Sequence, residues 1–368
     1  MAKKILFYIG SLAKGGAERV LVNLAEYFVS KDYEVTILTK CKDKEEYAIS
    51  DGIHRIPYDL SEEEAKVNRI NKFGVRIKKL RKIFSEENPD VIVSFLGKNN
   101  FLSVMAAKKL NIPVVVSVRA TPSEEYKNLL MRIMVNPIFR KAAGVVLQTN
   151  DARDFFKKDV AKKAVVLPNS IHPDFLKGAY PGEKDNTIIT VGRLDDNKNQ
   201  LMLINAFIKI AEEFPKTSLV LYGDGPKRKE WEELVNQSGY GECIAFTGRI
   251  SNVNERIHKD KIFVLPSRTE GMPTALIEAM ALGLACVSTD CPCGGPKELL
   301  GNSENGLLVP VDNVDAMADA LRKLLQNEEL IKTYGEKAYA KAKELHPDKV
   351  NRMWEEYLVG IMDAYQKR

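Results

Sequence analysis

The chain has 368 residues, of which 45% are hydrophobic and 29% charged, and its formal net charge is +5. This length exceeds one ordinary hydrophobic core and predicts two domains. No apolar run reaches the roughly 20 residues that a membrane-spanning helix needs, and the residues before the first strand are too few for a signal peptide, so we expect a cytoplasmic protein. Five cysteines without a C-x-x-C pair and four isolated histidines indicate neither a disulfide framework nor a metal site.

Strand-like runs alternate with helical patterns along the whole chain, which predicts an α/β protein with parallel sheets covered on both faces. The first series of strands is expected at 5–9, 34–39, 91–95, 114–118 and 145–148, and a second series at 187–191, 218–222, 244–247, 262–266 and 285–289. We therefore predict two doubly wound domains, 1–172 and 187–346, joined by a linker over 172–186. A helix over 347–368 is expected to pack back toward the first domain. Ligands of such folds bind at the carboxyl ends of the strands, so a cleft between the domains is the expected site.

Two acids, Glu270 and Glu278, stand eight residues apart after the predicted strand 262–266. Pro273 suits the first turn of a helix, which places Glu270 on the strand-to-helix loop and Glu278 inside an apolar helix. The amides at the start of this helix, with Gly271, Met272 and Thr274 around it, favour a phosphate. A buried Glu278 needs a partner, which is either a pair of sugar hydroxyls or an arginine.

The second series of strands opens with the loop Gly192–Asn199, which carries Arg193 and Lys198. Two permanent cations at the mouth of the predicted cleft are suited to a diphosphate, although each taken singly could form a surface ion pair. Asp224 ends the next strand, and Arg249 with Ile250 follows the one after, so these three residues are candidates for lining a nucleotide pocket.

Gly15 and Gly16 follow the first strand and open a helix. They indicate either an anion contact or a tight turn, and the segment matches neither the P-loop nor the G-x-G-x-x-G pattern. Cys291-Pro292-Cys293 is interpreted as a loop that contains thiols, with redox activity as the alternative. No Asp-x-Asp occurs in the chain, so we expect no metal and assign the charge of a phosphate to Arg193, Lys198 and helix dipoles.

The first half of the chain is the basic half. Up to Phe175, Lys and Arg outnumber the acids by 30 to 21, whereas acids outnumber them by 29 to 25 afterwards. The segment 69–82 holds seven cations and no acid at helical spacing, which suits either an anionic membrane surface or a solvated helix packed on the sheet. A second stretch, 127–141, is basic at both ends and rich in Met and Leu, and the same alternatives apply to it.

Four ordered pieces of the chain resemble the GT-B glycosyltransferases, specifically family 4 of the retaining enzymes, over essentially the full length. They are the Gly15-Gly16-Ala-Glu-Arg start, Gly192-Arg193 with Lys198, Gly223-Asp-Gly-Pro226, and Glu270-Gly271 with Glu278. The stretch 270–298 is also similar to bacterial enzymes that extend polyprenyl-diphosphate-linked glycans. This resemblance implies a retaining hexosyltransferase that moves a hexose or N-acetylhexosamine from a UDP-sugar without a metal.

The resemblance also implies roles for particular residues. Arg193 and Lys198 would bind the donor diphosphate, Glu270 would face the donor sugar, and Glu278 would hold the ribose. Gly16 would approach the phosphate and acceptor side, and Arg249 with Ile250 would border the base.

The chain departs from the family at one position, since Arg119 stands where many members carry a histidine near the reacting sugar. An arginine stays protonated and cannot act as a neutral base, so Arg119 is assigned to an acceptor phosphate or the donor sugar. We expect a lipid-linked or oligosaccharide acceptor, a peripheral location at the inner face of the plasma membrane and no nucleic-acid partner. A sugar-nucleotide 2-epimerase of the same architecture and a catalytically inactive nucleotide-sugar binding module are the competing functions.

Overall fold

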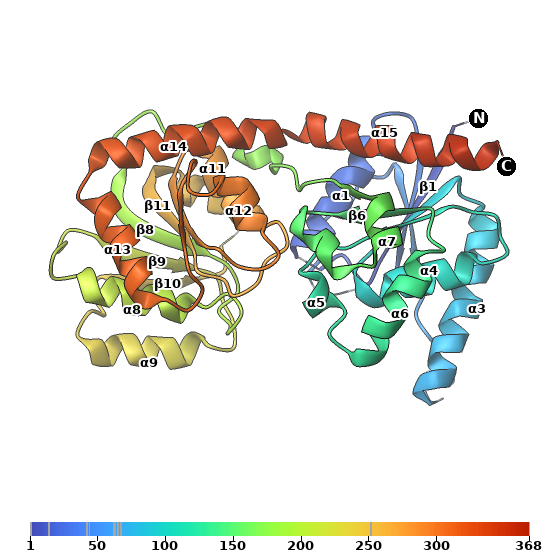
Figure 1. Ribbon diagram of the computed structural model, residues 1–368, viewed down its shortest axis with the longest axis horizontal. Helices are drawn as coiled ribbons and strands as arrows, with labels where there is room; N and C mark the ends of the chain where they lie inside the picture. Colours follow the sequence, from blue (N-terminus) through green and yellow to red (C-terminus); the bar gives the residue numbers. More distant parts are fainter. Residues whose placement is uncertain are drawn as a thin grey trace. The chain divides into compact units, whose positions relative to one another are not determined.

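The protein is represented by a computed structural model that describes residues 2–13, 15–41, 43, 45–61, 64, 66, 68–250 and 252–367, without the side chains of residues 69 and 70 (Figure 1). The chain divides into two compact units. Unit 1 comprises Met1–Pro168 together with Val350–Arg368, and unit 2 comprises Asn169–Lys349. The segment 172–186, expected as a linker, lies within unit 2, where the side chain of Phe175 is 4% exposed.

Unit 1 is built on a seven-stranded parallel sheet with the order β3-β2-β1-β4-β5-β6-β7. Its strands are β1 (Lys4–Ile9), β2 (Glu34–Thr39), β3 (Ile53–Pro57), β4 (Val91–Phe95), β5 (Val114–Ser117), β6 (Gly144–Leu147) and β7 (Ala164–Val166). Every residue of β4, β5 and β6 is buried, because helices cover both faces of the sheet and an apolar run satisfies both.

The helices of unit 1 are α1 (Gly16–Val29), α3 (Arg69–Glu87), α4 (Gly97–Ala107), α5 (Pro122–Glu125), α6 (Leu129–Phe139) and α7 (Lys158–Lys163), with the 3-10 turn η1 (Asp151–Phe155). The last helix, α15 (Pro347–Gln366), also joins this unit from Val350 onward. Its buried residues Val350, Trp354, Leu358 and Met362 recur at helical spacing and belong to the same core as β1 and α1.

Unit 2 contains a six-stranded parallel sheet with the order β10-β9-β8-β11-β12-β13. Its strands are β8 (Asp185–Val191), β9 (Ser218–Tyr222), β10 (Ile244–Gly248), β11 (Asp260–Leu265), β12 (Ala285–Thr289) and β13 (Leu307–Val309). In both units the strand order reverses beside the first strand, at β1/β4 and at β8/β11. Such a switch point opens a crevice at the carboxyl ends of the strands.

Helices cover both faces of the second sheet as well (Figure 1). They are α8 (Gln200–Ile210), α9 (Arg228–Ser238), α10 (Val253–Arg256), α11 (Thr274–Ala281), α12 (Gly295–Leu300), α13 (Val314–Leu325) and α14 (Glu328–Ala342), with 3-10 turns η2 (Pro173–Phe175), η3 (Ile257–Lys259) and η4 (Lys343–Leu345). One core cluster gathers α8, α9 and α13, and a second gathers α11, α12 and α14. The two clusters lie on opposite faces of the sheet, as a doubly wound fold requires.

Ten strands lie at or within a few residues of their predicted positions, and the sequence missed β3, β7 and β13. All three lie at the edges of the sheets, where fewer apolar residues are needed, and β7 and β13 have only three residues each. The predicted helix over 69–82 continues to Glu87 and ends at Asn88 in the left-handed conformation, with φ at 42°. Within the described part of the chain, no helix combines the length and apolar character needed to cross a membrane.

Candidate functional site

The loops that follow β8 and β11 flank the switch point of unit 2. The loop after β8 carries Arg193 and Lys198, and the loop after β11 carries Ser267 and Glu270. The alternation of strands and helices therefore brings residues about 70 positions apart to one edge of the sheet. The predicted donor-site residues of both loops lie at this edge.

The two loops are joined by an ion pair between Lys198 and Glu270. Lys198 Nζ lies 2.5 Å from Glu270 Oε1, and the Ser267 hydroxyl donates to the same oxygen at 2.6 Å. The side chains are only 26% and 11% exposed, so little water screens the pair. The sequence analysis selected both residues for the site. It predicted neither their ion pair nor the hydrogen bond from Ser267 to Glu270.

The backbone of Glu270 is held by the loop after β12. Its N–H donates to the carbonyl of Pro292 at 2.9 Å, and its carbonyl accepts the N–H of Cys293 at 3.0 Å. A side chain on Gly295 would stand 1.8 Å from the carbonyl oxygen of Gly271, so only glycine allows this close approach. The position of the Glu270 carboxylate is thus set by three loops together.

Arg193 is the exposed cation of the loop after β8. Its side chain is 67% exposed, and its Nε lies 3.6 Å from Asp195 Oδ2. The other oxygen of Asp195 accepts the backbone N–H of Lys198 at 2.9 Å, so one carboxylate contacts both residues of the loop. An exposed ion pair of this kind contributes little to stability, which leaves Arg193 available to a ligand at small cost.

The loop after β8 also packs closely on the loop after β9. Gly223 has φ at +137°, and a side chain there would stand 1.9 Å from the carbonyl oxygen of Gly192. The carbonyl of Asp224 accepts the N–H of Leu194 at 3.1 Å, and Asp224 Oδ1 accepts the N–H of Gly225 at 2.8 Å. The carboxylate of Asp224 therefore shapes its own turn.

Arg249 and Ile250 follow β10, the next strand end along the same edge. The N–H of Gly223 donates to the carbonyl of Gly248 at 2.8 Å, which joins this turn to the one after β9. Arg249 is exposed and Ile250 is half-buried.

A second arginine, Arg268, connects the loop after β11 to the loop after β8. The sequence analysis did not select this residue. Arg268 forms an ion pair with Asp312 at 2.9 Å and donates to the carbonyl of Asp196 at 2.6 Å. The Thr269 hydroxyl bonds to Asn197 at 2.8 Å. The only sequence feature that could have indicated Arg268 is its position between Ser267 and Glu270. Its partners, Asp312 and Asp196, are too distant in the sequence to be inferred from a local pattern.

The helix α11 begins at the same edge. Pro273 occupies the position before its first residue and supplies no side-chain cap, and no acid lies in the first turn of the helix. Met272 is anchored by Asn169, whose side-chain amide donates to the Met272 carbonyl at 2.6 Å. Glu278 lies in the second turn and is 6% exposed. This helix start has the polarity that favours an anion.

Gly15, Gly16 and Arg119, the predicted site residues of unit 1, also follow its strands. A side chain on Gly15 would stand 2.3 Å from a carboxylate oxygen of Glu18, whose pKa burial raises. This acid lies in the first turn of α1, where the sequence allowed an anion contact or a tight turn. Arg119 is 8% exposed and lies over the ring of Phe95, with 5.2 Å from the guanidinium carbon to the ring centre.

The cysteines of the loop after β12 lie next to the site. Cys291 is buried, and burial together with the charge of Glu270 raises its pKa to about 12. The thiolate is the reactive form of cysteine, so this thiol stays protonated near neutral pH. Its chemistry agrees with loop thiols rather than with a redox pair.

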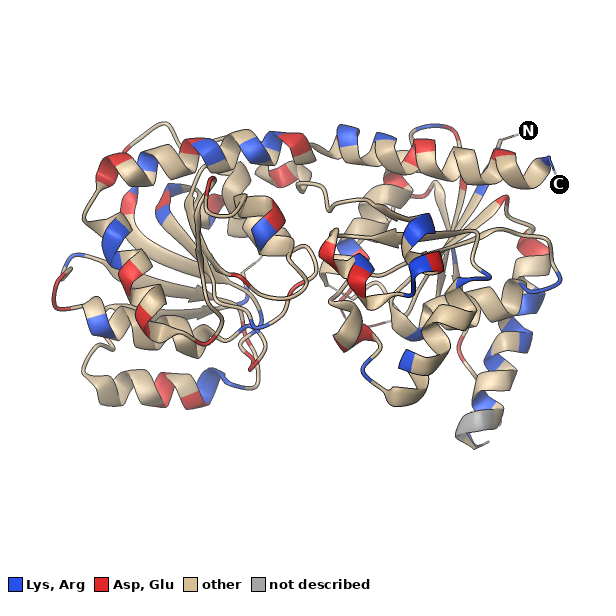
Figure 2. Ribbon diagram, in the orientation of Figure 1, with Lys and Arg blue, Asp and Glu red and all other residues tan. Residues whose placement is uncertain are grey.

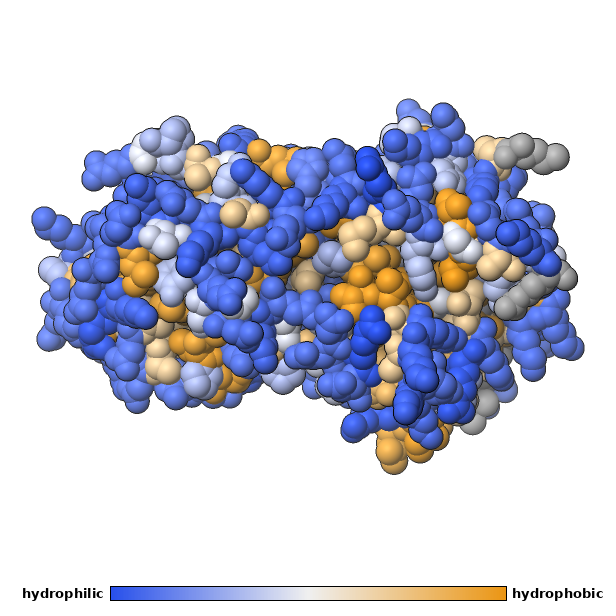
Figure 3. Space-filling view, turned by 45° about the horizontal axis from the view of Figure 1, so that its top comes forward, coloured by the Kyte–Doolittle hydropathy of each residue, from blue (hydrophilic) through white to orange (hydrophobic). Residues whose placement is uncertain are grey.

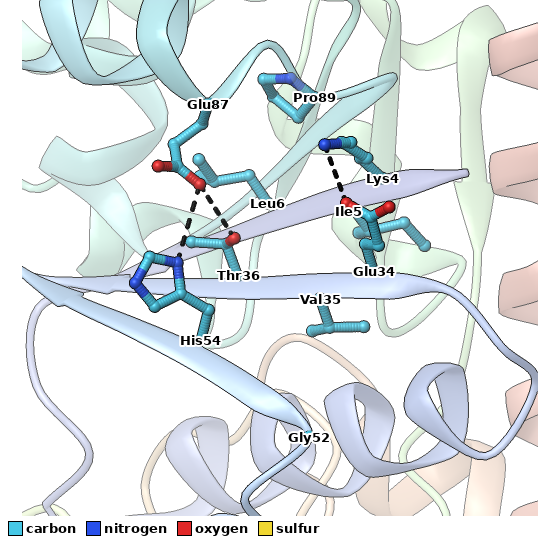
Figure 4. A pocket seen from close by; sticks show the side chains of 10 residues that line it. All are labelled: Lys4, Ile5, Leu6, Glu34, Val35, Thr36, Gly52, His54, Glu87 and Pro89. Carbon is cyan, nitrogen blue, oxygen red and sulfur yellow. Dashed lines mark hydrogen bonds and ion pairs between the residues drawn. The ribbon is translucent and has the colours of Figure 1, made fainter. Parts of the chain in front are cut away.

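A separate hollow of about 370 Å³ lies at the amino-terminal ends of β1 and β2 (Figure 4). Lys4 pairs with Glu34 at 2.8 Å across it, and Glu87 approaches His54 at 3.8 Å and accepts from Thr36 at 3.2 Å. The hollow lies at the end of the strands away from the switch-point loops.

Two family models match adjacent parts of the chain. Residues 14–175 match the model described as Glycosyltransferase Family 4, and residues 176–341 match the model described as glycosyl transferases group 1. The chain belongs to the family 4 glycosyltransferases. The glycosyltransferase class expected from the four ordered motifs is thereby confirmed.

Two relatives of this family 4 glycosyltransferase come from Campylobacter jejuni. One, 28% identical over 98% of this chain and 99% of its own length, is named GalNAc-alpha-(1->4)-GalNAc-alpha-(1->3)-diNAcBac-PP-undecaprenol alpha-1,4-N-acetyl-D-galactosaminyltransferase. The other, 29% identical over 97% of this chain and all of its own length, is named N-acetylgalactosamine-N,N'-diacetylbacillosaminyl-diphospho-undecaprenol 4-alpha-N-acetylgalactosaminyltransferase.

The crystal structure of HepE from Anabaena in complex with UDP has the same fold. Its TM-score is 0.81 at 18% identity, and the match covers 97% of this chain and 100% of that one. The predicted α/β architecture of the GT-B class, with two Rossmann-like units, is confirmed.

Proposed function

We propose that this family 4 glycosyltransferase moves a hexose or N-acetylhexosamine from a UDP-sugar to a lipid-linked or cell-surface glycan precursor, with retention of anomeric configuration and without a metal. The observation that carries the proposal is the Lys198–Glu270 pair, 2.5 Å apart at the switch point of unit 2 and close in sequence to the start of α11. Cations, a carboxylate and helix amides together match a sugar attached to a diphosphate.

The donor diphosphate binds Arg193, Lys198 and the amides of the first turn of α11. Both side chains lie on the loop after β8, and their charge-assisted hydrogen bonds contribute about 1.5 to 3 kcal/mol each. They neutralise the charge that develops on the departing UDP, which is the largest requirement of this reaction. The absence of an Asp-x-Asp sequence supports the assignment of this task to cations of the protein rather than to a metal.

Glu270 contacts the transferred sugar and Glu278 holds the ribose hydroxyls. The carboxylate of Glu270 is fixed by Lys198 and Ser267, so it accepts hydroxyl hydrogen bonds without rearranging. Glu278 is 6% exposed on α11, and a carboxylate so buried favours ligands that donate hydrogen bonds, as ribose hydroxyls do.

The nucleotide and the acceptor are proposed by analogy with the relatives. HepE was crystallised with UDP, and the two Campylobacter proteins are named for transfer to undecaprenol-linked glycans. The cationic excess of the residues up to Phe175 supports an acceptor that carries a diphosphate. The attacking hydroxyl enters on the face of the leaving UDP, whose phosphate takes the proton, because Arg119 cannot act as a base.

Helix α6 provides the surface that meets an anionic membrane. Four of its first six residues are large, apolar and exposed, at 73% for Leu129, 67% for Leu130, 61% for Ile133 and 38% for Met134. In Figure 3, apolar atoms surrounded by hydrophilic ones lie at the lower edge of the view, in the region of this helix. The stretch 127–141 contains four cations and no acid, which complements anionic lipid.

The basic helix α3, whose Lys and Arg positions are blue in Figure 2, is the other membrane candidate of the sequence, but two of its cations bind groups of the protein itself. Arg81 donates to the carbonyls of Met105 and Ala106 at 3.1 and 3.0 Å, and Lys79 pairs with Glu64 at 3.2 Å. Those two side chains hold α3 in place, whereas Lys78 and Lys82 are exposed.

Transfer assays with purified donors test the function. UDP-sugars, GDP-sugars and ADP-sugars are compared first by thermal shift, where a donor at 100 times its dissociation constant adds about 2.7 kcal/mol of stability. The preferred donor is then incubated with a lipid-diphosphate-linked acceptor, with and without EDTA. A GDP or ADP preference, or loss of transfer with EDTA, would contradict the donor or metal assignment, and epimer formation without acceptor would favour an isomerase.

Vesicle binding tests the membrane surface separately. Leu130→Asp is expected to reduce co-sedimentation with vesicles of anionic phosphatidylglycerol about tenfold or more, because a buried leucine contributes about 1.5 to 3 kcal/mol and the added charge opposes the lipid. Leu176→Asp, at another exposed leucine (41%) in unit 2, is the matched control and should leave binding unchanged. Equal losses for both variants would show that α6 is not the contact.

A further inference from the structure

Glu125 ties together the ends of two neighbouring strands of unit 1. Its Oε2 accepts the backbone N–H groups of Arg119 and Ala120 at 3.0 and 3.2 Å, after β5. Its Oε1 accepts the N–H of Gly97 at 2.6 Å, after β4, and the hydroxyl of Tyr126 at 3.1 Å. A single carboxylate thus fixes the loop of Arg119 against the first turn of α4.

The same carboxylate fills the start of α4. Gly97 is the first residue of this helix, and its N–H lies at the carboxyl edge of the sheet, where doubly wound folds accept anions. Since Glu125 accepts the N–H of Gly97 from within the protein, this amide is already bound to an anion. In unit 2 the first turn of α11 has no such acid.

The side chain of Arg119 is held from the other direction by aromatic rings. Its guanidinium lies over Phe95, 5.2 Å from the ring centre, and Phe95 stacks on Trp354 of α15 with 6.2 Å between the ring centres. Burial lowers the pKa of Arg119 to about 10, and the nearby charge of Glu125 opposes that shift, so the guanidinium stays protonated at neutral pH. It is therefore a permanent cation in a fixed position.

We propose that Glu125 is a positioning residue for sugar transfer, which holds Arg119 so that its guanidinium binds a phosphate of the lipid-linked acceptor. The proposal rests on the glycosyltransferase function proposed above. A fixed cation binds a phosphate with less loss of side-chain freedom than a mobile one. The backbone N–H groups of Gly97, Arg119 and Ala120 already donate to Glu125. We therefore assign the acceptor phosphate to the guanidinium of Arg119 rather than to these amides.

The test compares Glu125→Gln with Glu124→Gln, the neighbouring exposed acid on α5. Glutamine has one oxygen in place of two, so it cannot hold both the Gly97 and the Arg119 sides. Glu125→Gln is expected to lower kcat/KM for the acceptor about tenfold to a hundredfold, the range for a lost charged contact. Glu124→Gln should have no effect, and the thermal shift with UDP should be the same in both variants, since the donor residues belong to unit 2.

A double-mutant cycle separates positioning from a merely structural role. In an Arg119→Ala background, Glu125→Gln should cause no further loss of activity, because its effect acts through Arg119. An equal loss in both backgrounds, or none in the wild-type background, would overturn the proposal. If Glu125→Gln does not fold, Glu125→Asp serves for the same cycle, because its carboxylate is one methylene too short to reach both loops.

The acceptor identifies the ligand of Arg119. The penalty of Arg119→Ala should be large with a diphosphate-linked acceptor and small with the same glycan lacking the diphosphate. An equal penalty with both would place Arg119 on the donor sugar and refute the phosphate assignment. If the wild-type enzyme transfers sugar to neither acceptor, the proposed function fails rather than this inference.

Discussion

Replacing Asp260 by asparagine should change how the stability of unit 2 depends on pH. Asp260 is the first residue of β11 and is 5% exposed. Burial raises its pKa to about 7, with a further contribution from the charge of Asp185 on the paired strand β8, and Lys184 opposes the shift. The carboxyl group is thus protonated in the folded protein at a pH where it is ionised in the unfolded chain.

The sign and size of the effect follow from this difference. Between pH 3.8, the ordinary value, and about 7, the folded state binds a proton that the unfolded state has released, so stability falls as pH rises. Each pKa unit corresponds to about 1.36 kcal/mol, so the loss approaches about 4 kcal/mol above pH 7. An asparagine side chain at this position cannot ionise, so the Asp260→Asn variant should lack this loss.

Urea unfolding at pH 5, 6, 7 and 8 measures the effect. The chain has two tryptophans, Trp231 in unit 2 and Trp354 in unit 1, so a Trp354→Phe background reports on unit 2 by fluorescence. The stability difference between Asp260→Asn and its parent should grow with pH. Asp185→Asn should flatten the slope of the parent in part. Parallel pH profiles for Asp260→Asn and its parent would refute the assignment of the buried charge.

Three further predictions concern the site, the acid limit and the core. Glu270→Gln should lower kcat about a hundredfold with little change in UDP affinity. Lys198→Met should instead weaken UDP binding measured by calorimetry. Full activity of Glu270→Gln would contradict the assignment of Glu270 to the transferred sugar. Arg55 lowers the pKa of Glu46 to about 2, so the folded state loses stability as pH drops from about 4.5 toward 2. Arg55→Met should weaken this dependence of stability on pH, as followed by circular dichroism during acid titration. Leu358→Ala should destabilise unit 1 by about 2 to 5 kcal/mol in urea, and a loss confined to unit 2 would be inconsistent with its burial.

The alternation of strands and helices was predictable because it depends on local patterns. The fully buried strands β4 and β5 are recognisable as valine-rich runs, and the Pro273 turn marks the start of α11. The edge strand β13 has three residues and carries too little pattern to be recognised. Local sequence patterns therefore predicted the architecture but not the strands at the edges of the sheets.

The candidate site was predictable as a set of residues but not as a set of contacts. Lys198 and Glu270 were both selected, yet their ion pair joins residues that lie 72 positions apart in the chain. The anchoring of the Arg119 loop by Glu125 left no signal, since an acid in a short helix usually faces solvent. Side-chain pairs across strand ends depend on packing that no local pattern contains.

The division of the chain has a consequence for the order of events during synthesis. Unit 2 is continuous from Asn169 to Lys349, whereas unit 1 needs Val350, Trp354, Leu358 and Met362 to complete its core. The ribosome therefore releases every residue of unit 2 before it releases the last helix of unit 1. Although domains nearest the amino terminus generally fold first, unit 1 must wait with an incomplete apolar face until α15 emerges.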